Sequence, residues 1–307
     1  MERLALAFDL GGTRLRAALV TAQGEIKSHE EVATDVAGGP AAITVQMLAL
    51  ARQLGFTGKI KTVGIACPGP LDSSTGITLG IATLPGWTNF PLRQTIAEEF
   101  SLPTILENDG ISAAFGEWTS GAGQGCSNMV FVTISTGIGG GVIVDGNILH
   151  GARGMAGHVG HMMIAQQGPA CGCGGVGCFE ALASGTALSA RARAKGFASA
   201  AIAVEQARTG NAIALALVEE EATYLGYGFA SLLHLYSPER LVIGGGVAQA
   251  LDLMRNRIHH EIQRLAMPAF RDVQILAAKL GDRSGIVGAA RLAFQNLDVK
   301  SKGEIQK

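Results

Sequence analysis

One histidine and three cysteines lie close together in the middle of the sequence. Cys171, Cys173 and Cys178 fall within CGCGGVGC, and His161 precedes them in AGHVGH. Thiolates and an imidazole suit Zn²⁺, and a set of four protein ligands leaves no open position, so such a site is structural. The intervening glycines fit a chain that folds tightly around an ion. The cluster therefore predicts a structural zinc site formed by these four residues.

Three glycine-rich turns each follow an apolar run. They are DLGGT at 9–13, STGIGGG at 135–141 and GGG at 244–246. Glycines let the backbone approach a ligand closely, and the exposed N–H groups of such turns form a concave site for anions. None of the turns matches the GxxxxGK[ST] or GxGxxG motif. One such turn is usually an ordinary hairpin, but three such turns at strand ends predict a nucleotide-binding site formed by hairpins.

Asp9 stands at the end of its strand, directly before a glycine pair. Its carboxylate is placed to hold Mg²⁺, or a water of Mg²⁺, on the phosphates of a nucleotide. The alternative is a turn aspartate that caps its own backbone. The residues expected at the nucleotide are Asp9, Gly11, Gly12, Thr13, Thr136, Gly137 and Gly245.

The elements that must position these residues follow an α/β pattern. Strand-like apolar runs are LALAFDL, RAALVTA, KTVGIAC and TILEN, with helical patterns at 40–56 and 109–120. A second α/β unit begins at NMVFVTIS, includes a long helical stretch at about 211–236 and reaches a strand at RLVIGGG. DLGGTRLRAALV and STGIGGGVIVDG also share one design, in which a strand enters a glycine-rich turn and leaves through a second strand. Two similar lobes are expected.

Composition excludes several classes of protein. The 307 residues are 48% hydrophobic, and 24 Lys and Arg balance 25 Asp and Glu. No run of like charges suits nucleic acid or an anionic membrane, so a small metabolite is the expected partner. The N-terminal segment is not a signal peptide, and we expect a cytoplasmic protein. We do not expect the five cysteines to form disulfides in a reducing compartment. Cys67 and Cys126 are interpreted as buried small residues.

Five motifs occur in order along the chain: DLGGTRLRAAL, ENDGISAAFGE, VTISTGIGGGVIVDG, GHVGH and CGCGGVGCFEALASG. In this order they resemble the ROK family of sugar kinases, over about residues 3–295. The resemblance implies an α/β, two-lobed fold of the actin-like and hexokinase-like (ribonuclease H-like) type, with ATP and sugar in a cleft between the lobes and a structural zinc loop. It divides the chain into a small lobe (1–118 with 285–297), a larger lobe with the zinc loop (119–284) and a polar tail (298–307).

The resemblance implies phosphorylation of a hexose by Mg·ATP, usually at the 6-hydroxyl, and often a homodimer. A repressor branch of the family carries a DNA-binding domain before the first glycine turn; since DLGGT begins at Asp9, we expect none here. The zinc assignment agrees with the family motif. The residues implied to contact the sugar are Gly69, Thr83, Asn108, Asp109, His158, His161 and Glu180.

Asn108 and Asp109 stand where TILEN gives way to a helix. From the residues alone, one of them is simply an N-cap. The resemblance implies that Asp109 accepts the proton of the attacking hydroxyl while Asn108 helps to hold the sugar. A helix N-terminus stabilises an ionised carboxylate, so we expect Asp109 to be a weak base. A weak base is sufficient for phosphoryl transfer through a loose transition state, because this reaction depends mostly on positioning and charge neutralisation.

His158 departs from the family pattern, because most sugar kinases of the family have Glu in ExGH where this chain has HVGH. A carboxylate only accepts hydrogen bonds, whereas an imidazole also donates, as the carbonyl of a 2-acetamido sugar requires. The alternatives are a His158 without sugar contact and a pocket that still prefers glucose. Thr83 is a second departure, since many relatives have Asn there, and Gly69 is a sugar-contacting or a plain turn glycine.

HVGH together with GPACGCGGVGCFEALASG is most similar to bacterial N-acetylmannosamine kinases, which feed sialic acid carbon into metabolism. We therefore expect ATP-dependent phosphorylation of N-acetyl-D-mannosamine at the 6-hydroxyl. The alternatives are a glucokinase or N-acetylglucosamine kinase, and a non-catalytic sugar sensor. The intact Asp109 and the three glycine turns argue against the sensor.

Overall fold

The computed structural model describes residues 2–55, 58–81 and 83–305, with side chains up to residue 299. The chain forms two compact units. Unit 1 comprises Met1–Gly125, Ile148–Gly157 and Asp282–Lys307, and unit 2 comprises Cys126–Asn147 and His158–Gly281. Residues 119–125, 148–157 and 282–284 were expected in the second lobe, whereas their contacts group them with unit 1.

Unit 1 is built on a five-stranded sheet with the order β3-β2-β1-β4-β8. The strands are β1 (Leu4–Leu10), β2 (Arg14–Thr21), β3 (Ile26–Ala33), β4 (Ile60–Cys67) and β8 (Thr104–Asn108). β1, β2 and β3 pair antiparallel, while β1, β4 and β8 run parallel. β1 and β4 are buried almost throughout, which explains why both are continuous apolar runs.

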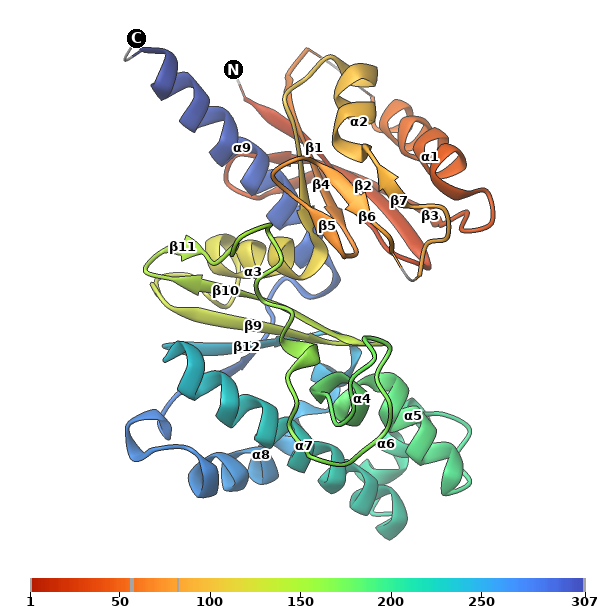
Figure 1. Ribbon diagram of the computed structural model, residues 1–307, viewed down its shortest axis with the longest axis vertical. Coiled ribbons are helices and arrows are strands. Elements are labelled where there is room, and N and C mark those ends of the chain that lie inside the picture. The colour runs from red at the N-terminus through yellow and green to blue at the C-terminus, as the bar shows by residue number, and fades with distance from the viewer. Residues whose placement is uncertain (1, 56–57, 82, 306–307) are drawn as a thin grey trace. The chain divides into compact units, whose positions relative to one another are not determined.

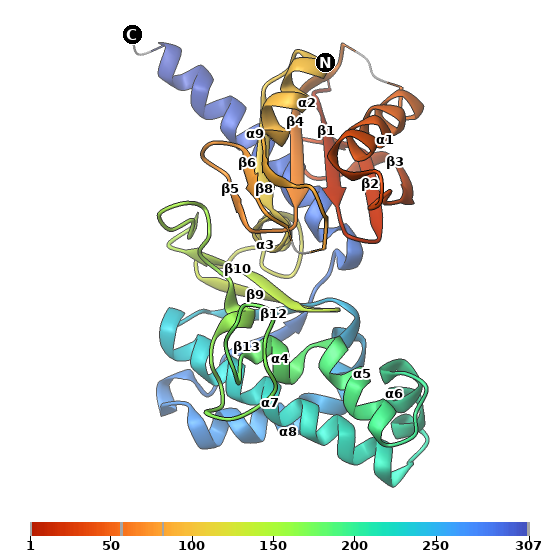
Figure 2. The same ribbon diagram turned by 45° about the vertical axis from the view of Figure 1, so that its right-hand side comes forward.

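Four helices accompany this sheet: α1 (Gly39–Gln53), α2 (Leu92–Phe100), α3 (Asp109–Ser120) and α9 (Ser284–Ile305). The sheet lies between α1 and α9 (Figure 1, Figure 2). A small sheet of β5 (Leu71–Asp72), β6 (Ile77–Leu79) and β7 (Thr88–Phe90) was not predicted. The polar tail was expected to begin at residue 298, but α9 continues to Ile305, through most of that segment.

The parallel strands bring three residues to one edge of the sheet of unit 1. Asp9 on β1 pairs in register with Ala66 on β4, and the next residue, Cys67, pairs with Asn108 on β8. Because the carboxyl ends of parallel strands meet at one edge, Asp9 and the Asn108–Asp109 turn lie on either side of the end of β4. The topology therefore explains why motifs about 100 residues apart lie near each other.

Helices α3 and α9 cross at very close range, because both have glycine at the crossing. A Cβ at Gly288 would lie 1.6 Å from the carbonyl oxygen of Ser112, and one at Gly116 would lie 2.3 Å from that of Ser284. Ser284 also donates a 2.7 Å hydrogen bond to the buried Glu117. This crossing holds the start of α3, and with it Asp109, against α9.

Unit 2 is built on a sheet with the order β11-β10-β9-β12-β13. Its strands are β9 (Met129–Ile134), β10 (Ile138–Val144), β11 (Asn147–Ile148), β12 (Arg240–Gly244) and β13 (Gln274–Ala277). β9 pairs antiparallel with β10 and parallel with β12, just as β1 pairs with β2 and β4. The two hairpins that share a sequence design thus occupy equivalent places in the two sheets.

The helices of unit 2 are α4 (Phe179–Ala183), α5 (Gly185–Ala194), α6 (Ala200–Arg208), α7 (Ala212–Tyr236) and α8 (Leu251–Leu265). α7 and α8 lie side by side, and α5 and α6 follow the zinc loop (Figure 1, Figure 2). Short 3₁₀ turns are η1 (Val159–His161), η2 (Gly246–Ala250), η3 (Pro268–Phe270) and η4 (Gly281–Arg283). Within the described part of the chain, no helix combines the length and the apolarity that a membrane span needs.

Candidate active site

The end of β8 and the start of α3 form a strand-to-helix turn at Asn108 and Asp109. Asn108 has an extended backbone, and its Oδ1 accepts the N–H groups of Gly110 at 2.9 Å and Ile111 at 3.3 Å. Asn108 is therefore the N-cap of α3. Asp109 is the first helical residue; its Oδ1 accepts the Gly110 N–H at 2.8 Å, and its side chain is exposed. The capping interpretation holds for Asn108, and the Asp109 carboxyl remains accessible to a ligand.

The pKa of Asp109 is raised to about 6. Desolvation by the surrounding protein is the main cause, and the Asp9 carboxyl adds to it, while the Gly110 N–H lowers the pKa. The side chain itself keeps access to solvent, so the effect comes from its packed surroundings and not from complete enclosure. The sequence analysis expected a weak base from the helix N-terminus alone. That expectation is wrong, because desolvation outweighs the helix dipole.

Asp9 is the penultimate residue of β1, and its half-buried side chain pairs with Arg16 at 3.3 Å. Burial raises the pKa of Asp9, and Arg16 lowers it. The start of α9 lies beside the carboxyl, since a Cβ at Gly285 would be 3.2 Å from Asp9 Oδ1. A carboxylate at a strand end has the donor chemistry for Mg²⁺ or its water, with Arg16 as its counter-ion in this structure.

The DLGGT turn closes the β1–β2 hairpin and lies against Thr83. Gly11 donates its N–H to the Arg14 carbonyl at 2.9 Å, and Thr13 is exposed. A Cβ at Gly12 would lie 3.3 Å from Thr83 Cβ, so a predicted nucleotide residue and a predicted sugar residue are adjacent. Gly69, two residues beyond β4, follows the same edge of the sheet. Unit 1 therefore gathers the predicted residues Asp9 to Thr13, Gly69, Thr83, Asn108 and Asp109.

The zinc cluster lies in unit 2. His161, Cys171 and Cys173 bring their ligand atoms within 4.8 Å of one another. Cys171 Sγ is 3.6 Å from His161 Nδ1, and Cys173 Sγ is 3.7 Å from Cys178 Sγ. Ligands at about 2.3 Å (S) and 2.0–2.1 Å (N) from a tetrahedral Zn²⁺ are separated by about 3.8 Å for S···S and 3.6 Å for S···N. The donor types and both spacings fit Zn²⁺. Cys178, the fourth predicted ligand, is not in the group whose ligand atoms all lie within 4.8 Å, so its role stays a prediction.

Glu180 links this loop to the STGIGGG turn. Its Oε2 accepts the N–H of Ile138 at 2.9 Å, and its Oε1 lies 3.9 Å from Cys171 Sγ. A Cβ at Gly137 would lie 2.3 Å from Glu180 Oε2, and one at Gly160 would lie 2.1 Å from the Ile138 carbonyl oxygen. Glycine is therefore required at residue 160, where a Cβ would meet backbone, whereas a Cβ at residue 137 would displace the Glu180 carboxyl.

His158 precedes the short turn η1, and His161 is the last residue of that turn. His161 donates its backbone N–H to the His158 carbonyl at 3.1 Å, and the two rings stack with centroids 6.3 Å apart. The His158 side chain is exposed. Partial burial and then the neighbouring His161 lower the pKa of His158. A neutral imidazole has one donor and one acceptor nitrogen.

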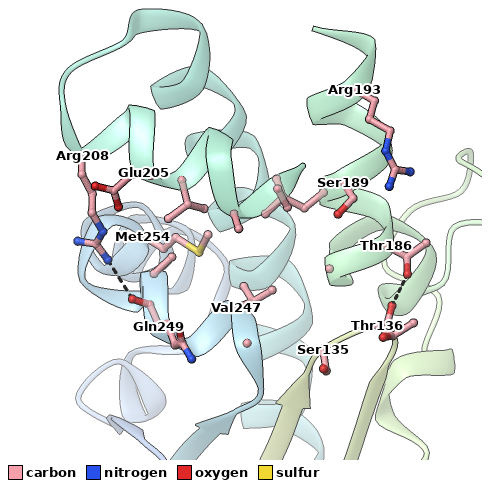
Figure 3. A pocket seen from close by; sticks show the side chains of 17 residues that line it. Ser135, Thr136, Thr186, Ser189, Arg193, Glu205, Arg208, Val247, Gln249 and Met254 are labelled. Atoms are coloured by element: carbon pink, nitrogen blue, oxygen red, sulfur yellow. Dashed lines mark hydrogen bonds between the residues drawn. The ribbon is translucent and has the colours of Figure 1, made fainter. Parts of the chain in front are cut away.

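Unit 2 also contains a cavity of about 640 Å³ (Figure 3). Of its lining, the predicted glycine turns include Ser135, Thr136 and Gly246, and only Thr136 was named as a nucleotide contact. One end is formed by Ser135 and Thr136, where Thr186 Oγ1 donates to the Thr136 carbonyl at 2.7 Å. The apolar wall is formed by Leu188, Ala200, Ala201, Val204, Val247, Ala250 and Met254. Arg193 and Arg208 add positive charge, and Arg208 is itself bound by Asp252. Its size and mixed lining are those of a small-molecule site.

Gly245 lies next to this cavity but does not line it. Glycine is required at this position by the backbone conformation and by close backbone packing. It has φ +82°, and a Cβ there would lie 2.3 Å from the carbonyl oxygen of Ile134. The residues that line the cavity are its neighbours Gly246 and Val247. Arg193 on α5 and Arg208 on α6 are exposed helix residues that belong to no recognisable sequence motif. The sequence alone therefore did not identify them as lining a cavity.

The comparisons with known proteins agree with this architecture. The model of the ROK family matches residues 5–296. A glucokinase of Halalkalibacterium halodurans is 35% identical over 98% of both chains, and an N-acetylmannosamine kinase of Shigella boydii is 36% identical over 94% of this chain and 97% of its own. The structure of a ROK family glucokinase from Streptomyces griseus, in complex with glucose and AMPPNP, superimposes with a TM-score of 0.82 at 32% identity and covers 95% of this chain and 99% of its own. The predicted hexokinase-like α/β fold is confirmed.

Proposed function

The chain belongs to the ROK family of ATP-dependent sugar kinases, and we propose that its sugar is N-acetyl-D-mannosamine, phosphorylated at the 6-hydroxyl in sialic acid catabolism. The observation that carries the proposal is the exposed His158 side chain beside His161, at the position where the family resemblance implies Glu in most sugar kinases. Glucose is the second candidate, because the Halalkalibacterium halodurans glucokinase is as similar to this chain as the N-acetylmannosamine kinases are.

The proposed sugar contacts follow from hydrogen-bonding types. The imidazole of His158 donates to the acetamido carbonyl at C2, where a carboxylate would place one acceptor against another. Glu180 accepts from sugar hydroxyls, in addition to the Ile138 N–H that it already binds. Asn108, Thr83, Gly69 and His161 complete the proposed set.

The proposed nucleotide site is the cavity of unit 2. Its apolar wall, which includes Val204 and Val247, suits a flat adenine base, and its size suits a nucleoside. The phosphates then extend toward Thr136 and Gly137, where backbone N–H groups of the glycine turn bind anions. Arg193, at the Thr136 side of the cavity, adds positive charge (Figure 3).

In unit 1, the DLGGT turn is proposed to contact the phosphates with Gly11, Gly12 and Thr13. Asp9 is proposed to hold Mg²⁺ or its water; the bound ion neutralises charge on the phosphates. Arg16 neutralises the Asp9 carboxylate when that ion is absent.

Asp109 is the proposed base of the reaction. The 6-hydroxyl attacks the γ-phosphorus, its proton passes to Asp109, and ADP leaves. A pKa of about 6 keeps the carboxyl mostly ionised at neutral pH while making it a better proton acceptor than an ordinary aspartate. The zinc loop binds no reacting group in this scheme; it holds the His158–His161 turn and Glu180 in place.

ADP formation with Mg·ATP tests the proposal when N-acetylmannosamine, glucose, N-acetylglucosamine and mannose are compared by kcat/KM. A preference for N-acetylmannosamine of at least about tenfold is expected, since one buried hydrogen bond contributes about 1.4 kcal/mol. A preference for glucose would overturn the assignment of the sugar. ADP formation with none of the sugars would support a non-catalytic sensor.

A further inference from the structure

A buried carboxyl group lies directly before the Asn108–Asp109 turn and has a partner on both of its oxygens. The Glu107 residue is 4% exposed. Its Oε1 accepts the backbone N–H of Asn108 at 2.8 Å, and its Oε2 lies 2.9 Å from His150 Nε2. One hydrogen bond therefore fixes the backbone of the N-cap residue, and the other fixes the carboxyl group that makes it.

His150 comes from the segment Ile148–Gly157, which belongs to unit 1 and continues along the chain into His158. The hydrogen bond to Glu107 raises the pKa of His150, which partial burial lowers. Both side chains line a cavity of about 420 Å³ together with Arg93 and Arg153. The contact joins residues 43 positions apart, and none of the motifs noted in the sequence includes His150.

We infer that His150, acting through Glu107, is a positioning residue for Asp109. The inference rests on the proposed role of Asp109 as the base. Without the imidazole, the Glu107 carboxyl loses the partner that orients it, and the Asn108 N–H loses a fixed acceptor. Because Asn108 caps α3, a shift of its backbone moves Asp109 with it. Displacements of about 1 Å at a reacting group cost on the order of 100-fold in rate.

The test compares His150→Ala with His150→Gln, whose amide can still donate to Glu107. Thr62→Val is the matched control: Thr62 is buried in the same unit and donates to the Pro103 carbonyl at 2.8 Å, away from the turn. For each variant, kcat, the KM for sugar and ATP, and Tm are measured. If His150→Ala does not fold, His150→Asn replaces it, because the shorter amide does not reach Glu107.

His150→Ala is expected to lower kcat by about 10- to 100-fold with each KM within about twofold of wild type. His150→Gln is expected to restore kcat to within a few-fold, and Thr62→Val to lower Tm without lowering kcat. Normal kcat in His150→Ala, no recovery in His150→Gln, or an equal kcat loss in Thr62→Val would each overturn the inference.

Asp109→Asn in the same assay separates the two claims. If Asp109→Asn is inactive while His150→Ala turns over normally, the base assignment stands and only the positioning role of His150 fails. If Asp109→Asn remains active, both the base assignment and this inference are wrong, whatever His150→Ala does.

Discussion

Glu180 accepts the backbone N–H of Ile138 at 2.9 Å, and this bond joins the end of the zinc loop to the glycine turn that begins β10. The carboxyl reaches the turn only because residue 137 has no side chain, since a Cβ there would lie 2.3 Å from Glu180 Oε2. The zinc loop and the proposed phosphate turn therefore act as one assembly in unit 2.

Gly137→Ala is expected to lower kcat/KM by about 100-fold or more, because the methyl group displaces Glu180 from a proposed sugar contact and alters the turn. Steady-state kinetics with both substrates measures the change. Gly139→Ala is the matched control: its Cβ would meet only Thr133 Cγ2, at 3.3 Å, and it should retain most activity. Equal kinetics in the two variants would contradict the assembly.

The pH dependence of turnover should report Asp109. The carboxyl must be ionised to accept a proton, and its pKa is raised to about 6 in the folded protein. The value of kcat/KM is therefore expected to fall about tenfold per pH unit below about pH 6. An acidic limb that begins only near pH 4, the range of an ordinary aspartate, would show that the pKa of Asp109 is not raised in the folded protein.

Asp109→Asn is expected to reduce turnover by about 10² to 10⁴ without lowering Tm at pH 7. Since the folded pKa is raised above the unfolded value, the native state binds the proton more tightly, and stability falls as pH rises from about 4 through about 6. At pH 7 the ionised carboxyl therefore opposes folding, and the neutral amide removes that cost. Thermal denaturation of wild type and variant at pH 5 and pH 7 measures this destabilisation. A Tm lower than that of wild type for the variant at pH 7 would contradict the predicted direction of the pKa shift.

The purified protein is expected to contain one Zn²⁺ per chain, by elemental analysis. Cys173→Ser should lose the metal and lower Tm, because ligand loss removes the energy with which a closed site stabilises its loop. Cys126→Ala, outside the cluster, should keep both metal and activity. Full zinc content in Cys173→Ser would remove Cys173 from the ligand set.

The sequence predicted the parts of the fold that depend on local pattern. β1, β4, β9 and β12 are largely apolar runs because they are covered by protein on both faces, and this pattern can be recognised from each segment alone. The cysteine cluster and the N-cap at Asn108 are local as well. The family match confirms the sugar kinase assignment that the ordered motifs gave.

Relationships between distant residues could not be predicted in this way. Glu180 and Ile138 are 42 residues apart, and no pattern in either segment shows that they meet. The pKa of Asp109 was misjudged for the same reason: the helix N-terminus is visible in the sequence, but desolvation depends on how the chain packs around the turn. The cavity of unit 2 could not be predicted because its lining comes from α5, α6 and η2, which are separated along the chain and share no motif.

The measurement that tests the central claim most directly is the sugar preference of His158→Glu, taken as kcat/KM for N-acetylmannosamine over glucose. His260→Glu, an exposed residue on α8 in the same unit, makes the same change of charge away from the turn and serves as the control. We predict that His158→Glu lowers the preference for N-acetylmannosamine by about tenfold or more, through the loss of one hydrogen-bond donor, while His260→Glu leaves it unchanged. An unchanged preference in His158→Glu would show that His158 does not recognise the C2 substituent and would contradict the account.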